Sequence, residues 1–383
     1  MSEPVIRGWC PGAHRPMMSG DGLVVRVRPW LSRVTAKQAR GLSALAVQFG
    51  TGFLEMTSRA NLQIRGVTEE GFPELLTGLE ALGLLDNDVA AESNRNIVTT
   101  PFRGADHDAM AQALTTALAA RDMPKLPGKF GFVIDAVGRR DLAQVSGDIR
   151  IEQGLNGWLV RANGNETGRA VDGPEVAVEL ALEIARWFVA SGGIGADGRG
   201  RMARHLAKGH VLPASLMGDT LPFPASDDPD PGLQQGGMAV SASFGLLPAA
   251  ALAALADLTD DILVTPFRML FLPAMSQLPE IEGLITRADD PMRRVVACSG
   301  APYCPQAEAD TRNLAARLAP QVGQGRLLHV TGCAKGCAHP MASDLVLIGA
   351  GGKYNLVTDG CPWDQPIQFG LDADDLSLLE SRT

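Results

Sequence analysis

The sequence predicts an α+β protein in which one pair of units occurs twice, in the order A-B-A′-B′. Two observations lead to this prediction. A strand–helix–strand–strand pattern at 22–67 recurs at 237–272, and a segment at 148–164 recurs in similar form at 344–360. Recurrence of this kind is a signature of duplicated supersecondary units. Short units with returning hairpins favour an α+β fold over a doubly wound parallel sheet.

The first unit begins with an alternating, β-branched strand at 22–28. Thr35 is the predicted N-cap of the helix that follows. Two short strands, 53–57 and 62–67, come next and are joined by a turn that contains Arg59. The helix is predicted from apolar residues on one face, at Leu42, Leu45, Ala46 and Phe49.

The second unit repeats this order after a gap of more than one hundred residues. We expect Arg268 to lie in the turn equivalent to the turn of Arg59. The repeated elements are a strand at 237–242, a helix at 248–258, and strands at 261–265 and 270–272.

The other repeated segment is predicted as a β-hairpin in both copies. Each copy begins with an acid, Asp148 or Asp344, and carries an aromatic residue, Trp158 or Tyr354, before an apolar pair. A Pro-rich, acidic stretch between the halves reads as an extended linker. The predicted divisions are 1–75 (A), 76–212 (B), 213–236 (linker), 237–285 (A′) and 286–383 (B′).

Composition excludes several classes of protein. The chain carries 43 acids against 34 bases, a formal charge of -9, which disfavours nucleic acid as a partner. No apolar run approaches the ~20 residues of a membrane span, so no membrane partner is expected. The first residues lack the apolar run of a signal peptide, which leads us to expect a cytoplasmic protein.

The cysteines carry the strongest chemical signal. Five of the six lie in the last 86 residues. Cys298-x5-Cys304 is followed, after 28 residues, by Cys333-x3-Cys337. Four thiolates in two close pairs can hold a [4Fe-4S] cluster. Structural zinc prefers knuckles of two to four residues and stays an alternative, as do unligated thiols. Cys361 is read as a free thiol.

Three further stretches resemble the sulfite/nitrite reductase superfamily together with this cysteine pattern. They are the turn at 57–63, Asn94-Arg95-Asn96, and Gly128-Lys129-Phe130-Gly131, in the superfamily's own order over about residues 5–365. The resemblance implies that A and A′ are ferredoxin-like half-repeats. It also implies that B and B′ are reductase-like α/β domains, and that Cys298, Cys304, Cys333 and Cys337 hold the cluster.

One branch, the precorrin-3B synthases, is more similar. Cys10-Pro11, the stretch 20–23 and the cluster loop 332–340 carry this resemblance. It implies a monooxygenase that hydroxylates C20 of precorrin-3A with dioxygen and closes a lactone in cobalamin biosynthesis. The implied cofactors are a [4Fe-4S] cluster and a mononuclear non-haem iron, with NADH as the ultimate reductant.

One departure separates this branch from the reductases. Sulfite and nitrite reductases surround their anion with four basic groups, and the matching positions here are Arg59, Arg95, Lys129 and Gly131. The missing base weakens the first alternative function, a sirohaem-dependent sulfite or nitrite reductase, in which sirohaem would be a cofactor. A non-catalytic iron–sulfur electron carrier is the third possibility.

The tetrapyrrole substrate is rich in carboxylates, for which Arg is a suitable partner. The predicted substrate-binding residues are Arg59, Arg95, Lys129, Arg65 and Arg268. A second basic group is interpreted as a solvated helix face. It consists of Arg199, Arg201, Arg204, His205, Lys208 and His210.

Two cofactor questions remain. His14 and His339 are the predicted ligands of the non-haem iron, because they lie in the two segments most similar to the synthase branch. The G-x-G-x-x-G run at 193–198 follows a predicted helix, whereas a Rossmann fingerprint follows a strand. Electrons are therefore expected from a separate NADH-linked reductase.

Overall fold

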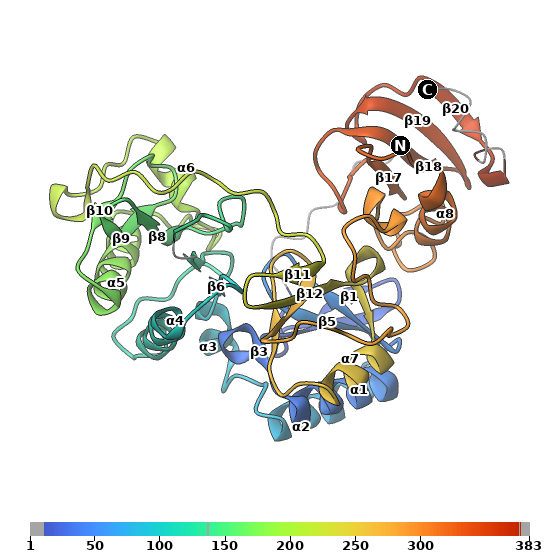
Figure 1. Cartoon of the computed structure of the whole chain (residues 1–383). Coiled ribbons are helices and arrows are strands. Elements are labelled where there is room, and N and C mark those ends of the chain that lie inside the picture. Colours follow the sequence, from blue (N-terminus) through green and yellow to red (C-terminus); the bar gives the residue numbers. More distant parts are fainter. Residues whose placement is uncertain (1–10, 136–137, 375, 377–383) are drawn as a thin grey trace.

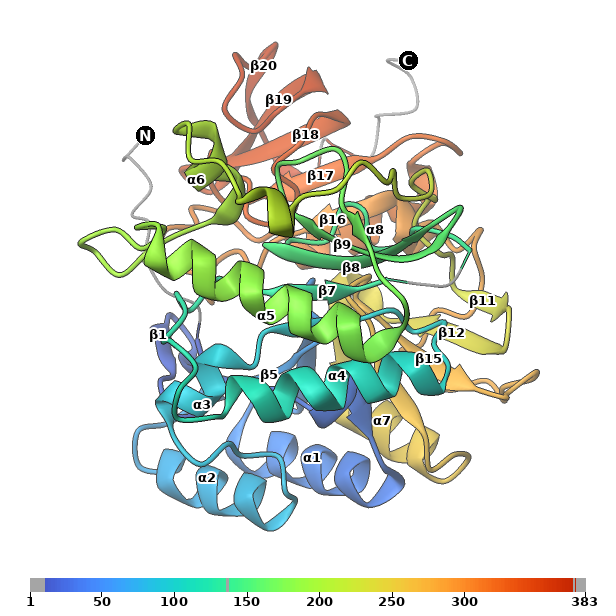
Figure 2. The ribbon, with the colours of Figure 1, turned by 90° about the vertical axis from the view of Figure 1, so that its left-hand side faces the viewer.

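The computed structural model describes residues 11–135, 138–374 and 376. Three bodies make up the molecule (Figures 1 and 2). A base holds two sheets with helices beneath them. The first lobe and the cluster lobe, each built on one sheet, rise from the base on opposite sides in Figure 1.

The base consists of two five-stranded sheets that exchange strands. In the first base sheet the order is β1 (Met17–Ser19), β2 (Gly22–Val27), β5 (Leu62–Val67), β4 (Phe53–Met56) and β13 (Leu246–Pro248). In the second it is β11 (Gly232–Gln234), β12 (Gly237–Ser241), β15 (Met269–Pro273), β14 (Ile262–Val264) and β3 (Arg33–Val34). Each half thus contributes an edge strand to the other half's sheet, which explains why the two form a single body.

Helices α1 (Ala36–Phe49), α2 (Phe72–Ala81) and α7 (Ala249–Ala256) lie beneath these sheets (Figure 1). Thr35 caps α1 as predicted: its side chain accepts a hydrogen bond from the Gln38 N–H, and the Gln38 side-chain oxygen accepts one from the Thr35 N–H. Leu42 and Ala46 are fully buried, so the predicted stripe is the core face of the helix. Residues of both halves share one hydrophobic core, and the predicted duplication of this unit is confirmed.

Arg59 and Arg268 lie in equivalent turns, as predicted, but one position apart within them. The two turns are equivalent: the Thr57 N–H bonds the Asn61 carbonyl at 2.9 Å, and the Thr265 N–H bonds the Met269 carbonyl at 3.0 Å. The left-handed residue of the turn is Ala60, with φ 53°, in one half and Arg268, with φ 56°, in the other. Arg268 therefore corresponds to Ala60, and Arg59 corresponds to a phenylalanine.

The two lobes have the same sheet topology, with three parallel strands followed by two antiparallel ones. The first lobe contains β6 (Ile97–Thr99), β7 (Phe132–Ile134), β8 (Ile149–Gly154), β9 (Gly157–Ala162) and β10 (Arg169–Ala170). The cluster lobe contains β16 (Val295–Ala297), β17 (Leu328–Thr331), β18 (Ser343–Ala350), β19 (Lys353–Gly360) and β20 (Gln368–Leu371). The predicted hairpins are β8–β9 and β18–β19.

Helices cover one face of each lobe. In the first lobe, α4 (Ala105–Leu118) and α5 (Pro174–Ala190) pack on the sheet (Figure 2). In the cluster lobe, α8 (Arg312–Leu318) does so. The remaining helical segments are α3 (Val89–Asn94), α6 (Met202–Ala207), η1 (Trp30–Ser32), η2 (Ala214–Leu216), η3 (Ser243–Gly245), η4 (Pro291–Arg294) and η5 (Ala319–Gln321).

The segment predicted as a linker is largely extended, but it bonds to its neighbours along its length. Thr220 and Gly168 exchange two backbone hydrogen bonds at 2.9 and 3.1 Å, and the Ser226 N–H bonds the Arg140 carbonyl at 3.0 Å. The segment then forms β11, the edge strand of the second base sheet. Among the described residues, no helix combines the length and apolar character that a membrane span requires.

Candidate functional site

The topology of the cluster lobe brings the four paired cysteines to one edge of its sheet. Strands β16 and β17 are parallel, so their carboxyl ends meet, and Cys298 follows the first strand while Cys333 follows the second. Cys304 and Cys337 lie on the same two loops. The Gly332 N–H donates to the Cys298 Sγ at 3.3 Å, which joins the loops directly.

The thiols influence one another electrostatically. Desolvation raises the pKa of Cys333 and of Cys337 above a thiol's ordinary value, and the neighbouring thiols raise both further. Within the described ranges, no three His, Cys, Asp or Glu side chains gather as they would around a single metal ion. A four-iron cluster spreads its cysteine ligands farther apart than one ion does. Two pairs of thiols on adjoining loops are the donor set that a four-iron cluster requires.

Cys361 lies on a different loop from these four cysteines. It follows β19, and its N–H donates to the Asp364 carboxylate at 2.7 Å. The next residue, Pro362, packs against Gly336 in the cysteine loop. Cys361 therefore supports the loop through its neighbour. Cys10 lies outside the described residues.

The first lobe has no cysteines at its equivalent edge. Pairing of β6 with β7 places Thr100 where the cluster lobe has Cys298. Asp135 follows β7, is fully buried, and accepts hydrogen bonds from the N–H groups of Asp141 and Leu142 at 2.9 to 3.1 Å. A carboxylate thus organises this loop in the first lobe.

Arg59 and Lys129 meet where the first lobe contacts the base. Both terminal nitrogens of Arg59 lie 3.4 Å from the Lys129 carbonyl oxygen, and one lies 3.4 Å from the Ser146 Oγ. Arg201 also reaches that Ser146 Oγ, at 2.9 Å. The sequence had assigned Arg201 to a solvated face, so its place in this group was missed. Arg199 is exposed and paired with exposed Asp197, in the loop before α6.

Arg95, predicted with Arg59 and Lys129, is bound by residues of the base. Its guanidinium forms a bidentate pair with Asp86 at 2.9 and 2.8 Å and donates to the Arg28 carbonyl at 2.8 Å. It also stacks 4.0 Å above the Trp30 ring, and only 8% of its side chain is exposed. Arg95 therefore braces the base.

Arg65 and Arg268 lie on different base sheets. Arg65 forms a bidentate pair with Asp21, at 2.9 Å for both bonds, and lies 3.5 Å from Glu55. The side chain of Arg268 packs against Gly245. The structure therefore does not bring these two arginines together.

The inner faces of the two base sheets differ in polarity. Cross-strand pairing makes Arg26, Gln63 and Glu55 a row on the first sheet, and Arg65 continues this face. At the corresponding positions the second sheet has Ala239, Phe271, Leu263 and Pro273. The alternation of Asn61, Gln63 and Arg65 with apolar residues is the sequence signal that could have found this polar face.

Glu55 lies at the centre of the polar face. Its carboxylate oxygens are 3.5 Å from Arg65 and 3.5 Å from Arg312, the first residue of α8 in the cluster lobe. The hairpin of β1 and β2 adds a second contact with that lobe, because the Ser19 hydroxyl lies 3.4 Å from the Tyr303 carbonyl. The polar face thus contacts the loop that carries Cys304.

The two histidines predicted as iron ligands have other neighbours. The His14 Nε2 donates to the Asp86 carbonyl at 2.5 Å. The His339 ring lies 6.0 Å from the ring of buried His329. Neither gathers two further ligands among the described residues. The structure therefore does not fit the predicted mononuclear iron site.

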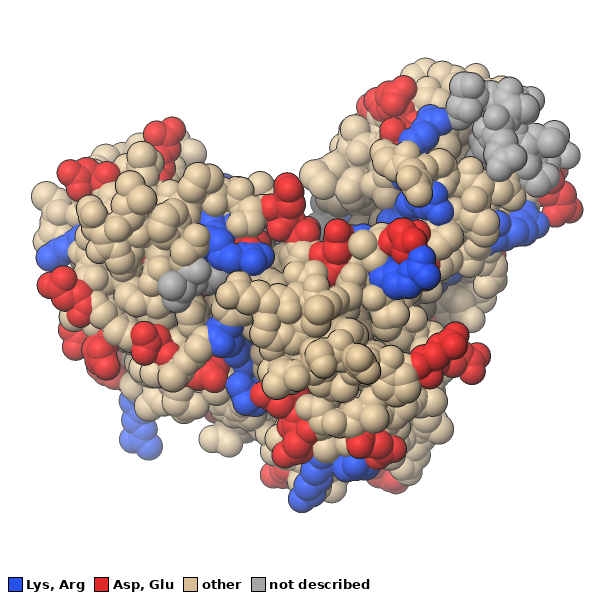
Figure 3. All heavy atoms as spheres, in the orientation of Figure 1, with Lys and Arg blue, Asp and Glu red and all other residues tan. Residues whose placement is uncertain are grey.

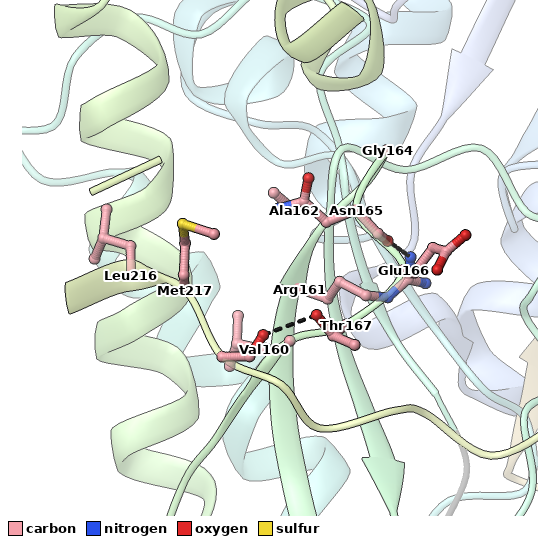
Figure 4. Close-up of a pocket in the computed structure, with 11 residues that line it drawn as sticks. Val160, Arg161, Ala162, Gly164, Asn165, Glu166, Thr167, Leu216 and Met217 are labelled. Atoms are coloured by element: carbon pink, nitrogen blue, oxygen red, sulfur yellow. Dashed lines mark hydrogen bonds between the residues drawn. The ribbon is translucent and has the colours of Figure 1, made fainter. Parts of the chain in front are cut away.

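A cavity of about 350 Å³ lies in the first lobe, between the end of β9 and the segment around Met217 (Figure 4). Arg161 lines it, but its guanidinium is bound to the Glu152 carboxylate at 2.9 and 3.0 Å and to the Asn165 carbonyl at 2.6 Å. None of the predicted site residues lines this cavity. The surface is also hollowed between the lobes, where side chains of both charges lie along the rim (Figure 3).

Comparisons with known proteins agree with this architecture. Residues 15–82 match a family model described as nitrite/sulfite reductase ferredoxin-like half domain. A precorrin-3B synthase from Sinorhizobium sp is 31% identical over 92% of this chain and 83% of that protein. A ferredoxin–nitrite reductase from Leptolyngbya laminosa is 23% identical over 89% of this chain and 79% of that protein.

The fold is shared with a solved structure, that of the Mycobacterium tuberculosis NirA protein. The TM-score is 0.67 at 20% identity, and the match covers 93% of this chain and 79% of the other. The predicted α+β fold, with duplicated half-repeats and reductase-like domains, is confirmed.

Proposed function

The chain belongs to the precorrin-3B synthase family, within the nitrite/sulfite reductase superfamily, and from this we propose that it is an oxidoreductase acting on precorrin-3A. The proposed reaction is the one implied by the resemblance. Dioxygen hydroxylates C20, and the ring A acetate closes a lactone. One oxygen atom enters the product and the other leaves as water, which requires two electrons from a reductant.

One observation favours oxygenation of precorrin-3A over reduction of sulfite or nitrite. Gly131 stands where the reductases have their fourth base. Its N–H donates to the buried Asp148 at 3.0 Å, and a Cβ at this position would lie 3.2 Å from the Asn96 carbonyl oxygen. Position 131 therefore has no side chain that could bring a positive charge to an anion. Arg95, another member of the set, is already paired with Asp86. An anion cage is thus incomplete, while a large substrate with several carboxylates needs no such cage.

The cluster proposal rests on four residues of this chain. Cys298, Cys304, Cys333 and Cys337 would hold it, and it would supply one-electron storage and delivery. The Gly332 N–H directed at the Cys298 Sγ withdraws charge from that sulfur. Buried loop backbone, such as Gly300 and Gly332, would limit the access of water to the sulfurs.

Substrate carboxylates would bind to the basic group at the junction of the first lobe and the base. The guanidinium groups of Arg59 and Arg201 meet there at the Ser146 hydroxyl, beside the backbone of Lys129, in a chain whose net charge is -9. A local concentration of base is what such a substrate requires in an acidic protein. An Arg fork can orient a carboxylate through two parallel bonds, and a Lys ammonium adds a point charge.

The electrons would come from a separate NADH-linked reductase in the cytoplasm. The glycine run at 193–198 follows α5 and precedes α6, so it lacks the strand–loop–helix context of a dinucleotide site. His14 and His339 do not form a site for a second iron among the described residues.

The visible spectrum of the anaerobically purified full chain tests the proposal. We expect the broad absorption of an iron–sulfur cluster without sirohaem bands, and product formation from precorrin-3A in air with a reductant. Stoichiometric sirohaem together with nitrite or sulfite reduction would overturn the proposal. A cluster spectrum with no turnover of any tetrapyrrole would instead indicate an electron carrier.

A further inference from the structure

The start of α8 is fixed against the first cluster cysteine. The fully buried Thr311 precedes the helix, and its hydroxyl donates to the Cys298 carbonyl at 2.7 Å. Gly300, two residues after Cys298, lies so close that a Cβ there would approach the Thr311 hydroxyl to 2.4 Å. Arg312, the next residue, is thereby held beside the cysteine loop.

The Arg312 guanidinium is positioned between that loop and the polar face of the base. Only 18% of its side chain is exposed, and one terminal nitrogen lies 3.5 Å from the Glu55 carboxylate. Its Nε is buried and has no hydrogen-bond partner in the part of the chain that the structure describes. Burial lowers the pKa of Arg312, whereas Glu55 and Cys298 act in the opposite direction. The arginine and the cysteine are therefore within electrostatic reach of each other.

We propose that Arg312 is a positioning residue for the cluster: its charge, held beside Cys298, makes the cluster easier to reduce, and Glu55 opposes it. This proposal rests on the cluster of the proposed function and not on its tetrapyrrole chemistry. On reduction, one electron adds one negative charge to the cluster, and no bond to Arg312 forms or breaks.

The physical reason is the charge on the reduced state. Cluster potentials depend on net charge, hydrogen bonding and solvent exposure. A cation in a partly desolvated site stabilises the more negative state by more than it would in water. Glu55 is specific to this side of the duplicated base, because the second base sheet has Leu263 at the corresponding position. The first base sheet thus offers Arg312 a carboxylate, whereas the second base sheet has an apolar side chain at the equivalent position.

A redox titration of the purified full chain with dithionite, followed by absorbance and electron paramagnetic resonance, tests the proposal without substrate. Arg312→Gln should lower the midpoint potential by an amount equal to about a tenfold change in the one-electron equilibrium, or 59 mV. Arg317→Gln is the matched control, because Arg317 lies on the same helix but is exposed and paired with exposed Asp374. Its shift should be several times smaller. Arg312→Lys should keep most of the wild-type potential.

Glu55→Gln supplies a second measurement of opposite sign. Removing this carboxylate leaves Arg312 less compensated, so the potential should rise. Iron and sulfide analysis of each variant identifies loss of cluster. If the Arg312→Gln variant does not retain the cluster, the midpoint potentials of Arg312→Lys and Glu55→Gln test the proposal instead. Equal shifts for Arg312→Gln and Arg317→Gln, or a lower potential for Glu55→Gln, would overturn the proposal. If the variants shift the midpoint potential as described but the wild-type protein does not oxygenate precorrin-3A, only the proposed function is overturned.

Discussion

Asp148 and Asp344 hold the same position in the two lobes. The Asp148 carboxylate accepts a hydrogen bond from the Gly131 N–H at 3.0 Å, and the Asp344 carboxylate accepts one from the Leu327 N–H at 2.8 Å. Each acid stands at the start of a hairpin, and each donor immediately precedes the middle strand of its sheet. The duplication has thus kept this contact. At the opposite edge, where the parallel strands end, the lobes differ: Thr100 stands in the first lobe where the cluster lobe has Cys298.

The Asp148 contact should be essential for the first lobe. Asp148 is fully buried and also binds the Met202 N–H at 2.8 Å and the Arg201 Nε at 2.9 Å. Asp148→Ala leaves these donors without their acceptor and should lower the free energy of unfolding by about 3 kcal/mol. Urea denaturation followed by circular dichroism measures this. Asp197→Ala, at an exposed position, should change it by less than about 0.5 kcal/mol. Equal losses in the two variants would contradict the assignment.

Serine substitution tests the cluster ligands. Replacing Cys298, Cys304, Cys333 or Cys337 by Ser should remove most of the iron and sulfide, because a serine hydroxyl is a poor substitute for thiolate. Cys361→Ser should retain both, since Cys361 lies on a separate turn. Chemical analysis of iron and sulfide is the measurement. Unchanged content in all four ligand variants would reject the ligand set.

The basic group at the junction is tested by substrate affinity. Charge-assisted pairs contribute roughly 1.5–3 kcal/mol, so Arg59→Ala should raise the dissociation constant for a precorrin by about tenfold to a hundredfold. The cluster absorbance should stay intact. Arg199→Ala removes the same charge from an exposed pair and should have much less effect. A comparable loss in both variants would place the substrate elsewhere.

His329 should make the protein less stable in acid. It is fully buried on β17, both of its ring nitrogens lack partners among the described residues, and desolvation, with His339 nearby, lowers its pKa to about 4. The unfolded chain regains a pKa of about 6.5. Between these values the unfolded state binds a proton that the native state does not, so stability falls as the pH falls.

Comparison of wild type with His329→Met isolates this contribution. From pH 7.5 to 5.0, the wild type should lose roughly 2 kcal/mol more stability than the variant, most of it below pH 6.5. Urea denaturation at several pH values measures the difference. An equal pH dependence for both proteins would show that His329 is not responsible.

The sequence was sufficient for the repeated elements. Strand β5 has the predicted bounds, and Thr35 caps α1, because periodicity and capping are local signals. The exchange of β3 and β13 between sheets could not be predicted, since strands of two and three residues carry no pattern of their own. The one-residue offset of Arg268 depends on which residue of the turn has positive φ.

Site residues were predictable only where spacing determines placement. The four cysteines lie on two loops whose strands are parallel neighbours, so the pairs had to meet. Arg95 lies in a stretch that resembles the reductase superfamily, but its pairing with Asp86 depends on the tertiary packing of the segment before α3. Arg312 carries no local signal at all, because its importance arises from its contact with Glu55 and from its neighbour Thr311, which bonds the Cys298 carbonyl.

The most direct test of the proposed reaction is labelled dioxygen. The anaerobically purified protein, supplied with precorrin-3A, a chemical or enzymatic reductant and ¹⁸O₂, should give a hydroxylated lactone that carries one ¹⁸O atom at C20, as mass spectrometry would show. The remaining oxygen atom should appear as labelled water. A product whose new oxygen comes from unlabelled water, or no product beside rapid reduction of nitrite or sulfite, would contradict the account.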